Sequence, residues 1–272
     1  MKYSFDTPGA HEIAMYSDLR RHSSQSYFIV ENEKVVSSLL ASDIEIVSLY
    51  CTKEHFEAKR EEVEKHKQTK PAKVFLAKKE DMSKIVGFGL HQGILASANT
   101  PKGKTLTEIM KKAAKPSLFV MLDEVTDAEN MGALYRTALA LHATAVIIDK
   151  KSTSPWMRRS VRVSMGAVFS LPTIKVQSLP QAIEELRSSG IKTFAATTSP
   201  AANTLYGSDL TGDVALMFGS EGHGIKPEVI AACDGEINLP MPNLVDSLNV
   251  AVAQGIFLYE VRRQRALMMN NR

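Results

Sequence analysis

Apolar residues in the second half of the chain occur in short unbroken runs, and stretches with helical spacing separate these runs. The run "SLFVMLDEV" at 117–125 is almost wholly apolar, as expected of a strand covered on both faces of a parallel sheet. Strands alternating with helices predict an α/β fold with a mostly parallel sheet and helices on both faces. We expect further strands at 144–149, 173–176, 192–198, 214–219 and 235–240, and helices at 130–141, at 155–172 with an end near Gly166, at 178–190 and from Ser247 to Arg265.

The first hundred residues predict a separate small α/β domain. Helical spacing at 33–42, 55–69 and 79–86 alternates with strand-like segments at 44–52, 72–79 and 92–98. Turn residues and a short basic helix, Thr105 to Ala114, then lead to Pro116. We therefore predict a domain at 1–100, a linker at 101–116 and a larger domain at 117–272.

Charge and cysteine content narrow the class of protein. Of the net charge of +3, residues 1–115 contribute +4, from 19 basic and 15 acidic residues. This mild basic bias is compatible with nucleic-acid binding. No apolar run is long enough to cross a membrane, and the first 17 residues lack a secretory pattern, so we expect a cytoplasmic protein. Only Cys51 and Cys233 occur, which argues against a disulfide framework or a zinc site.

Candidate chemistry lies in three polar segments that follow predicted strands. They are "DEVTDAENMGALYRTA", "FGSEGHGIKPE" and "LPMPNLVDSLNV". In open α/β sheets, ligands bind beyond the carboxyl ends of the strands, so these segments can share one site. A P-loop reading of Gly103-Lys104-Thr105 fails because alanine stands at position 98.

Each segment carries residues suited to holding a ligand. Asn130 is expected to cap a helix, with Arg136 about one and a half turns further on; the alternative is a capped helix with an exposed arginine. Glu221 lies among three glycines, where its carboxylate would repel phosphate and could pair with Arg136. The alternative is a helix C-cap or a hairpin turn, which rarely needs three glycines. His223 is a candidate acid or base, although a loop histidine is more often incidental.

The third segment crowds small polar side chains at a helix start. Ser247 is expected to cap the last helix, while Asn243, Asp246 and Asn249 exceed what a cap requires. As a nucleophile Ser247 would need a paired base, and no histidine or aspartate stands at a recognisable spacing. We therefore do not interpret the chain as a hydrolase.

In this order the three segments resemble the three motifs of the SpoU branch of the SPOUT methyltransferases. Asn130, Gly132 and Arg136 match the first motif, "FGSEGHG" the second, and "LPM" followed by "SLNVAVAQGIFLYE" the third. The stretch "VRVSMGAVFSLP" is similar to the family's sequence between the first two motifs. The segments "YFIVENEKVV" and "HQGILA" resemble the ribosomal-protein-like RNA-binding domain of many members. One departure is Asn243, where the family commonly has glycine, and asparagine tolerates positive φ.

The resemblance implies a C-terminal trefoil knot, a rare exception to unknotted topology. It implies that the knot binds S-adenosylmethionine, that no metal is required, and that the protein is a homodimer with sites near the subunit interface. The reaction would be methyl transfer to a ribose 2′-hydroxyl of ribosomal or transfer RNA. We expect ribosomal RNA because the N-terminal extension and "FLYEVRRQRA" are similar to that branch.

The resemblance also assigns residues to roles. A guanidinium keeps its proton in proteins, so we expect Arg136 to orient a phosphate and stabilise a developing alkoxide rather than act as a base. The implied catalytic residues are Arg136, Asn130, Glu221, Ser247 and Asn249. The implied cofactor-binding residues are Gly219, Leu239, Met241, Leu248 and Thr197.

Two other functions fit the α/β scaffold. A non-catalytic RNA-binding protein is disfavoured because the polar residues of all three motifs are intact. A nucleotide-dependent oxidoreductase is disfavoured because GxGxxG is absent after the strand at 117–125.

Overall fold

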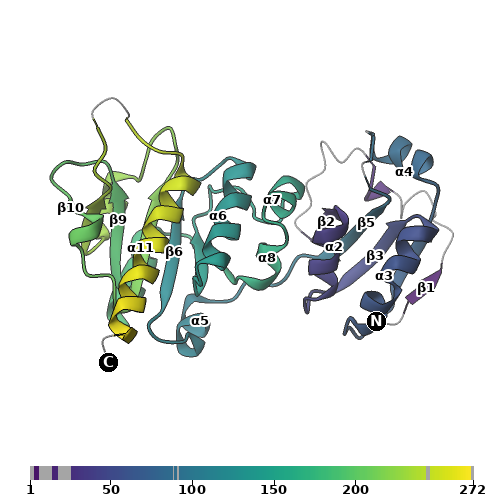
Figure 1. The fold of residues 1–272 in the computed structure, drawn as a ribbon, viewed down its shortest axis with the longest axis horizontal. Coiled ribbons are helices and arrows are strands. Elements are labelled where there is room, and N and C mark those ends of the chain that lie inside the picture. Colours follow the sequence, from purple (N-terminus) through teal and green to yellow (C-terminus); the bar gives the residue numbers. More distant parts are fainter. Residues whose placement is uncertain are drawn as a thin grey trace. The chain divides into compact units, whose positions relative to one another are not determined.

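The computed structural model describes residues 3–5, 14–17, 26–87, 89–90, 92–242 and 246–270. The chain divides into two compact units (Figure 1). The smaller comprises Met1–Lys102 and Trp156–Ser170, and the larger comprises Gly103–Pro155 and Leu171–Arg272. Among the described residues, no helix is both long enough and apolar enough to cross a membrane.

The larger unit is built on a seven-stranded sheet in the order β10–β12–β9–β11–β6–β7–β8. Every neighbouring pair runs parallel, which confirms the expected architecture. Consequently the carboxyl ends of all strands meet at one edge. The strands are β6 (Leu118–Asp123), β7 (Ala145–Ile148), β8 (Thr173–Lys175), β9 (Lys192–Thr197), β10 (Asn203–Thr204), β11 (Val214–Gly219) and β12 (Gly235–Asn238).

Helices cover both faces of this sheet (Figure 1). Apolar side chains of α5 (Leu106–Lys112), α9 (Leu179–Ser188) and α10 (Pro227–Ala232) share one core with alternate residues of the central strands. On the other face α6 (Ala128–Ala140) packs along α11 (Val250–Asn270). Phe257 of α11 contacts Phe218 of β11 edge to face, with ring centroids 5.7 Å apart. The short 3-10 helix η1 (Leu205–Gly207) follows β10.

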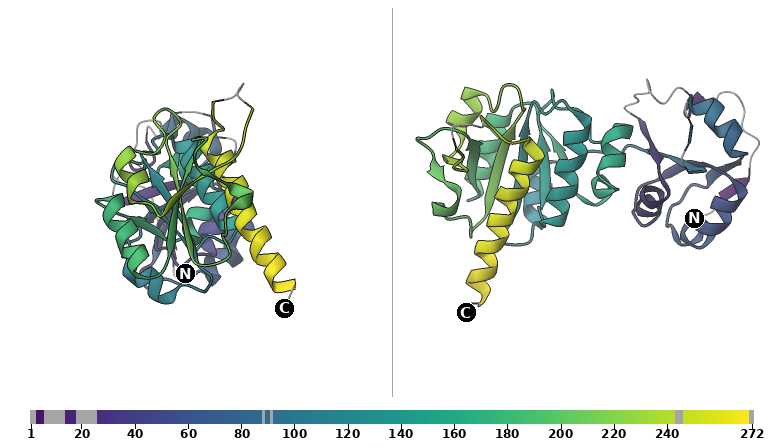
Figure 2. Two further views of the ribbon diagram at one scale, coloured as in Figure 1. Left: turned by 90° about the vertical axis from the view of Figure 1, so that its left-hand side faces the viewer. Right: turned by 45° about the horizontal axis from the view of Figure 1, so that its top comes forward.

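Helix α11 is tied to the beginning of the sheet by a buried arginine. The Arg265 guanidinium donates hydrogen bonds to the carbonyl oxygens of Pro116 and Ser117, both at 2.9 Å. Beyond this anchor the helix extends past the sheet (Figure 2). Its last described turns expose Leu267 and Met268. The anchor therefore fixes the helix whose first turns belong to the third motif.

The smaller unit has a five-stranded mixed sheet in the order β1–β4–β3–β5–β2. Strand β5 runs antiparallel to β2 and β3, whereas β4 runs parallel to β1 and β3. Strands β1 and β2 were not predicted, whereas the helices and the other strands lie at the expected places. The elements are β1 (Tyr3–Phe5), β2 (Tyr27–Glu31), α2 (Glu33–Leu40), β3 (Ile46–Cys51), α3 (Lys53–Lys65), β4 (Ala72–Leu76), α4 (Lys79–Val86) and β5 (Ile94–Asn99).

The helix predicted within 155–172, with its end near Gly166, is confirmed as α7 (Arg158–Val163). A second short helix, α8 (Ala167–Ser170), follows Gly166 and was not predicted. Met165 and Gly166 separate them with φ values of 53° and 88°, which no α-helix accommodates. A side chain at Gly166 would also collide with Ser38 of α2, because an added Cβ would lie 2.5 Å from the Ser38 Cβ.

These two helices pack in the smaller unit against β2. Arg158 and Arg162 of α7 form ion pairs with the buried carboxylate of Glu31, at 2.7 and 3.1 Å. Phe28 of β2 contacts the Trp156 ring, with centroids 4.9 Å apart. Contacts with residues distant in sequence therefore decide where this segment lies.

The trefoil knot stays a prediction. Residues 243–245, in the connection from β12 to α11, lie outside the described residues, and so does the expected departure at Asn243.

Candidate active site

The three polar segments meet at the carboxyl edge of the parallel sheet. Strands β6 and β11 are neighbours, and their last residues, Asp123 and Gly219, are directly paired. The segment after β6 leads into α6, and the segment after β11 forms the glycine-rich loop. The first two motifs therefore lie together at the carboxyl edge of the sheet, as expected from the sequence.

A cluster of two amides and one carboxylate joins all three motifs. The Asn130 Nδ2 donates to Glu221 Oε1 at 3.0 Å. The Asn249 Nδ2 donates to Asn130 Oδ1 at 2.9 Å and also to Glu221 Oε1. Because Glu221 is exposed and uses only one oxygen here, its second oxygen can still receive a hydrogen bond from a ligand.

Two helix caps differ from the sequence prediction. The N-cap of α6 is Asp127, whose carboxylate accepts the backbone N–H of Asn130 at 2.8 Å, so Asn130 stands three residues inside and its amide is free for the cluster. Asn249, rather than Ser247, caps α11, because its Oδ1 accepts the N–H groups of Ala251 and Val252. Ser247 is exposed in the irregular segment before the helix.

Arg136 does not join this cluster within one copy of the chain. The predicted ion pair with Glu221 is absent from the described residues, and the Glu221 carboxylate is held by amides instead. Arg136 follows Asn130 by six residues, which places it about 9 Å further along α6 and about 240° around the helix axis. Its exposed side chain therefore projects from a different face of α6.

The glycine-rich loop closes tightly on itself. Gly224 donates its N–H to the Ser220 carbonyl at 2.9 Å and has a φ of 66°. A Cβ at Gly219 would lie 2.1 Å from the Gly224 carbonyl carbon, so only glycine fits there. By contrast, a Cβ at Gly222 would have no heavy atom within 4 Å, so its surroundings are open to a ligand. His223 is exposed and donates its backbone N–H to Ser220 Oγ at 3.3 Å.

A second group of candidate residues lies where β9 and β12 end. Thr197 and Asn238 are paired neighbours in the sheet. The Thr197 Oγ1 and the Asn238 Oδ1 are buried and make no hydrogen bond within the described part of the chain. Buried polar atoms of this kind normally have a partner, so they mark a place for a polar ligand group. Leu239 and Met241, shortly after Asn238 in the chain, are partly buried, and so is Leu248, just before α11.

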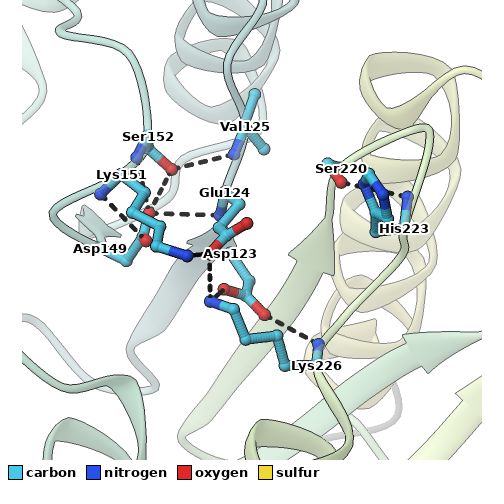
Figure 3. Close-up of polar contacts among 9 residues, drawn as sticks. All are labelled: Asp123, Glu124, Val125, Asp149, Lys151, Ser152, Ser220, His223 and Lys226. Carbon is cyan, nitrogen blue, oxygen red and sulfur yellow. Dashed lines mark hydrogen bonds and ion pairs between the residues drawn. The ribbon is translucent and has the colours of Figure 1, made fainter.

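Sequence reasoning missed a charged network at the carboxyl ends of β6 and β7 (Figure 3). Asp123, Glu124 and Asp149 bring carboxylate oxygens within 4.8 Å of one another. Lys226 Nζ lies 2.9 Å from Asp123 Oδ1 and 2.7 Å from Glu124 Oε1, and Lys151 Nζ lies 2.5 Å from the same Glu124 oxygen. The Lys151 ammonium and then that of Lys226 lower the pKa of the Glu124 carboxyl to about 2.

These carboxylates already have cationic or N–H partners. Asp149 accepts N–H groups from Glu124, Lys151 and Ser152. Three clustered carboxylates have the composition of a metal site. Here the ammonium groups of Lys151 and Lys226 supply positive charge among them. In the sequence, Asp123 and Glu124 come at the end of an apolar run, and Lys226 follows the glycine loop. This pattern does not show which residues pair with one another.

Two family models match the chain in succession. Residues 117–259 match the SpoU rRNA Methylase family, and residues 31–115 match the RNA 2'-O ribose methyltransferase substrate binding domain. The 23S rRNA (guanosine-2'-O-)-methyltransferase RlmB of Haemophilus influenzae is 36% identical over 69% of this chain and 77% of its own length. The protein of the same name from Vibrio vulnificus is 38% identical over 64% of this chain and 71% of its own.

Solved structures share the fold over nearly the whole chain. A protein of Porphyromonas gingivalis assigned to the TrmH family of RNA methyltransferases superposes with a TM-score of 0.80 and 26% identity, covering 95% of this chain and all of its own. The SpoU methyltransferase AviRb of Streptomyces viridochromogenes, at 23% identity over the same shares, also gives a TM-score of 0.80. The latter similarity concerns the fold alone.

Proposed function

Because the chain belongs to the SpoU rRNA methylase family, we propose that it transfers a methyl group to a ribose 2′-hydroxyl of RNA. The observation that carries this proposal is the cluster of Asn130, Glu221 and Asn249, one residue from each motif, at the carboxyl edge of the sheet. The two family matches support the same function: residues 117–259 match a methylase, and residues 31–115 match an RNA 2'-O ribose methyltransferase substrate-binding domain.

S-adenosylmethionine is the methyl donor, and when bound it supplies an electrophilic methyl group. The residues at the ends of β9 and β12 fit such a ligand. The unsatisfied Thr197 Oγ1 and Asn238 Oδ1 offer hydrogen-bonding groups to a polar nucleoside or amino-acid portion. Partly buried Leu239, Met241 and Leu248 offer the apolar contact that small-molecule sites require.

The chain's own polar residues orient the substrate hydroxyl. Asn130 and Asn249 hold one Glu221 oxygen, which leaves the other to accept the ribose hydroxyl hydrogen bond. As the methyl group is transferred, the hydroxyl passes its proton to that free Glu221 oxygen. Arg136 binds an RNA phosphate and stabilises the developing alkoxide. Ser247, exposed before α11, contacts the substrate rather than the protein.

Ribosomal RNA is the proposed substrate, and the methylated nucleotide is a guanosine of the large-subunit RNA. The relatives from H. influenzae and V. vulnificus carry that activity in their names. We assign RNA binding to residues 1–100 and methyl transfer to residues 117–272. Within the predicted linker at 101–116, α5 packs into the core of the larger unit. Such a substrate places the protein in the cytoplasm, where ribosomes are assembled.

The active form is a homodimer that pairs through α6 and α11. Val252 and Tyr259 stand seven residues apart on one face of α11 and are 53% and 61% exposed. Leu139, three residues after Arg136 on α6, is 38% exposed. Burying this apolar surface against a second copy would also bring Arg136 to the subunit interface, which explains its separation from the cluster in a single chain.

The proposal is tested by incubating the purified protein with methyl-labelled S-adenosylmethionine and size-fractionated ribosomal and transfer RNA. Label in large-subunit RNA, located in a guanosine ribose, is the expected result. Label in transfer RNA would overturn the substrate assignment. Cofactor binding without label in any RNA, including naked RNA and assembly intermediates, would favour a non-catalytic RNA-binding protein.

A further inference from the structure

We propose that Lys226 is a positioning residue that fixes the Glu221-bearing loop against the start of α6. The inference rests on the proposed methyl transfer, because its functional consequence is the placement of Glu221. Lys226 itself lies outside the Asn130–Glu221–Asn249 cluster and follows the glycine-rich loop by two residues.

Lys226 makes a two-point attachment to the end of β6 (Figure 3). Its backbone N–H donates to Asp123 Oδ2 at 2.9 Å, and its Nζ donates to Asp123 Oδ1 at 2.9 Å. Asp123 is fully buried and is the last residue of β6. A charged pair with both oxygens engaged and one partner buried is far more rigid than a surface ion pair.

The same ammonium group reaches the residue that turns the chain toward α6. Glu124 has a φ of 52°, a left-handed conformation that is uncommon for a residue with a side chain and that persists only where the surroundings hold it. Its N–H donates to Asp149 Oδ1 at 3.2 Å, and its Oε1 lies 2.7 Å from Lys226 Nζ. Backbone and side chain of Glu124 are therefore both restrained.

These restraints control the distance between two motifs. Three residues after Glu124, Asp127 caps α6 and presents Asn130 to Glu221 at 3.0 Å. Five residues before Lys226, Glu221 occupies the other side of that hydrogen bond. Lys226 thus links the end of β6, which leads into the helix with Asn130, to the loop that contains Glu221. A shift of about 1 Å at such a site can cost about 100-fold in rate.

The kinetic test compares Lys226→Met, Lys226→Arg and, as a matched control, Lys151→Met in the full-length protein. Lys151 shares the Glu124 carboxylate but is not attached to the glycine loop. Lys226→Met should lower kcat by about tenfold or more while the RNA KM changes less than about threefold. Lys226→Arg should recover most of the loss, and Lys151→Met should lose less than about threefold. A Lys226→Met enzyme with wild-type kcat would overturn the proposal.

A double-mutant cycle distinguishes positioning from a general loss of stability. If Lys226 acts through Glu221, adding Lys226→Met to Glu221→Gln should lower kcat by less than about twofold beyond Glu221→Gln alone. Losses that multiply would show that Lys226 acts independently of Glu221 and would contradict the mechanism.

Hydrogen exchange tests the positioning without reference to activity. Backbone amides of residues 220–224 should exchange at least about tenfold faster in Lys226→Met than in wild type, and Lys226→Arg and Lys151→Met should exchange near the wild-type rate. Unchanged exchange in Lys226→Met would sink the inference even if the protein is a methyltransferase. Faster exchange in a protein without methyl transfer would support the structural link while refuting the proposed function.

Discussion

Asn249 performs two separable tasks, and two substitutions distinguish them. Its Oδ1 caps α11 by accepting the Ala251 N–H at 3.0 Å and the Val252 N–H at 3.3 Å. Its Nδ2 donates to Asn130 and to Glu221. Asn249→Ser keeps a capping oxygen but removes the amide donors, whereas Asn249→Ala removes both.

The expected magnitudes follow from these contacts. Loss of an N-cap costs about 1 kcal/mol, which corresponds to roughly 2 to 4 °C in melting temperature for a domain of this size. A hydrogen bond to a charged group contributes about 1.5 to 3 kcal/mol, and the exposure of Glu221 favours the lower end. About 1.5 kcal/mol lost from the transition state lowers kcat about tenfold.

Thermal unfolding and single-turnover methyl transfer measure the two effects on the same samples. Both variants should lose about tenfold in rate, and only Asn249→Ala should lose about 1 kcal/mol of stability. A wild-type rate in Asn249→Ser would refute the role of the amide donors. Equal stability of the two variants would refute the capping assignment.

Three further predictions concern other parts of the chain. Arg136→Lys should lower kcat by at least about tenfold, because lysine cannot present the planar guanidinium fork. Its cofactor affinity, measured by calorimetry, should be unchanged, and near-normal turnover would contradict this. Gly219→Ala should cost about 1 to 3 kcal/mol in chemical denaturation and weaken cofactor binding, because its Cβ would lie 2.1 Å from the Gly224 carbonyl carbon; wild-type stability would show that the loop relaxes. Burial raises the pKa of the Cys51 thiol and that of the Cys233 thiol to about 12, so iodoacetamide should label neither appreciably at pH 8. Labelling should rise toward pH 12 or on unfolding in urea, and fast labelling of the native protein at pH 8 would contradict the burial.

The parallel sheet of the larger unit was predictable because its central strands carry their own signal. Strand β6 is buried at every position, and such a strand gives a continuous apolar run in the sequence. The cap of α6 was less predictable, since Asp127 and Asn130 are both favourable cap residues and only the backbone geometry selects between them.

Features that depend on distant partners escaped local reasoning. The helix end near Gly166 was predicted, but α8 beyond it and the packing of Gly166 against Ser38 were not. Likewise, Lys226 and Asp123 are 103 residues apart and meet only after β6 and β11 pair. A lysine and an aspartate are suited to an ion pair, but the sequence around each contains no sign of the other.

The most direct test of the proposed function is the chemical position of the transferred methyl group. Labelled large-subunit ribosomal RNA would be digested to nucleosides and analysed by mass spectrometry, with Glu221→Gln as the matched control. The account predicts label in a 2′-O-methylguanosine, from a linkage resistant to alkaline hydrolysis, and a loss of about tenfold or more in the control. A methyl group on a base, or a Glu221→Gln variant as active as wild type, would contradict the site described.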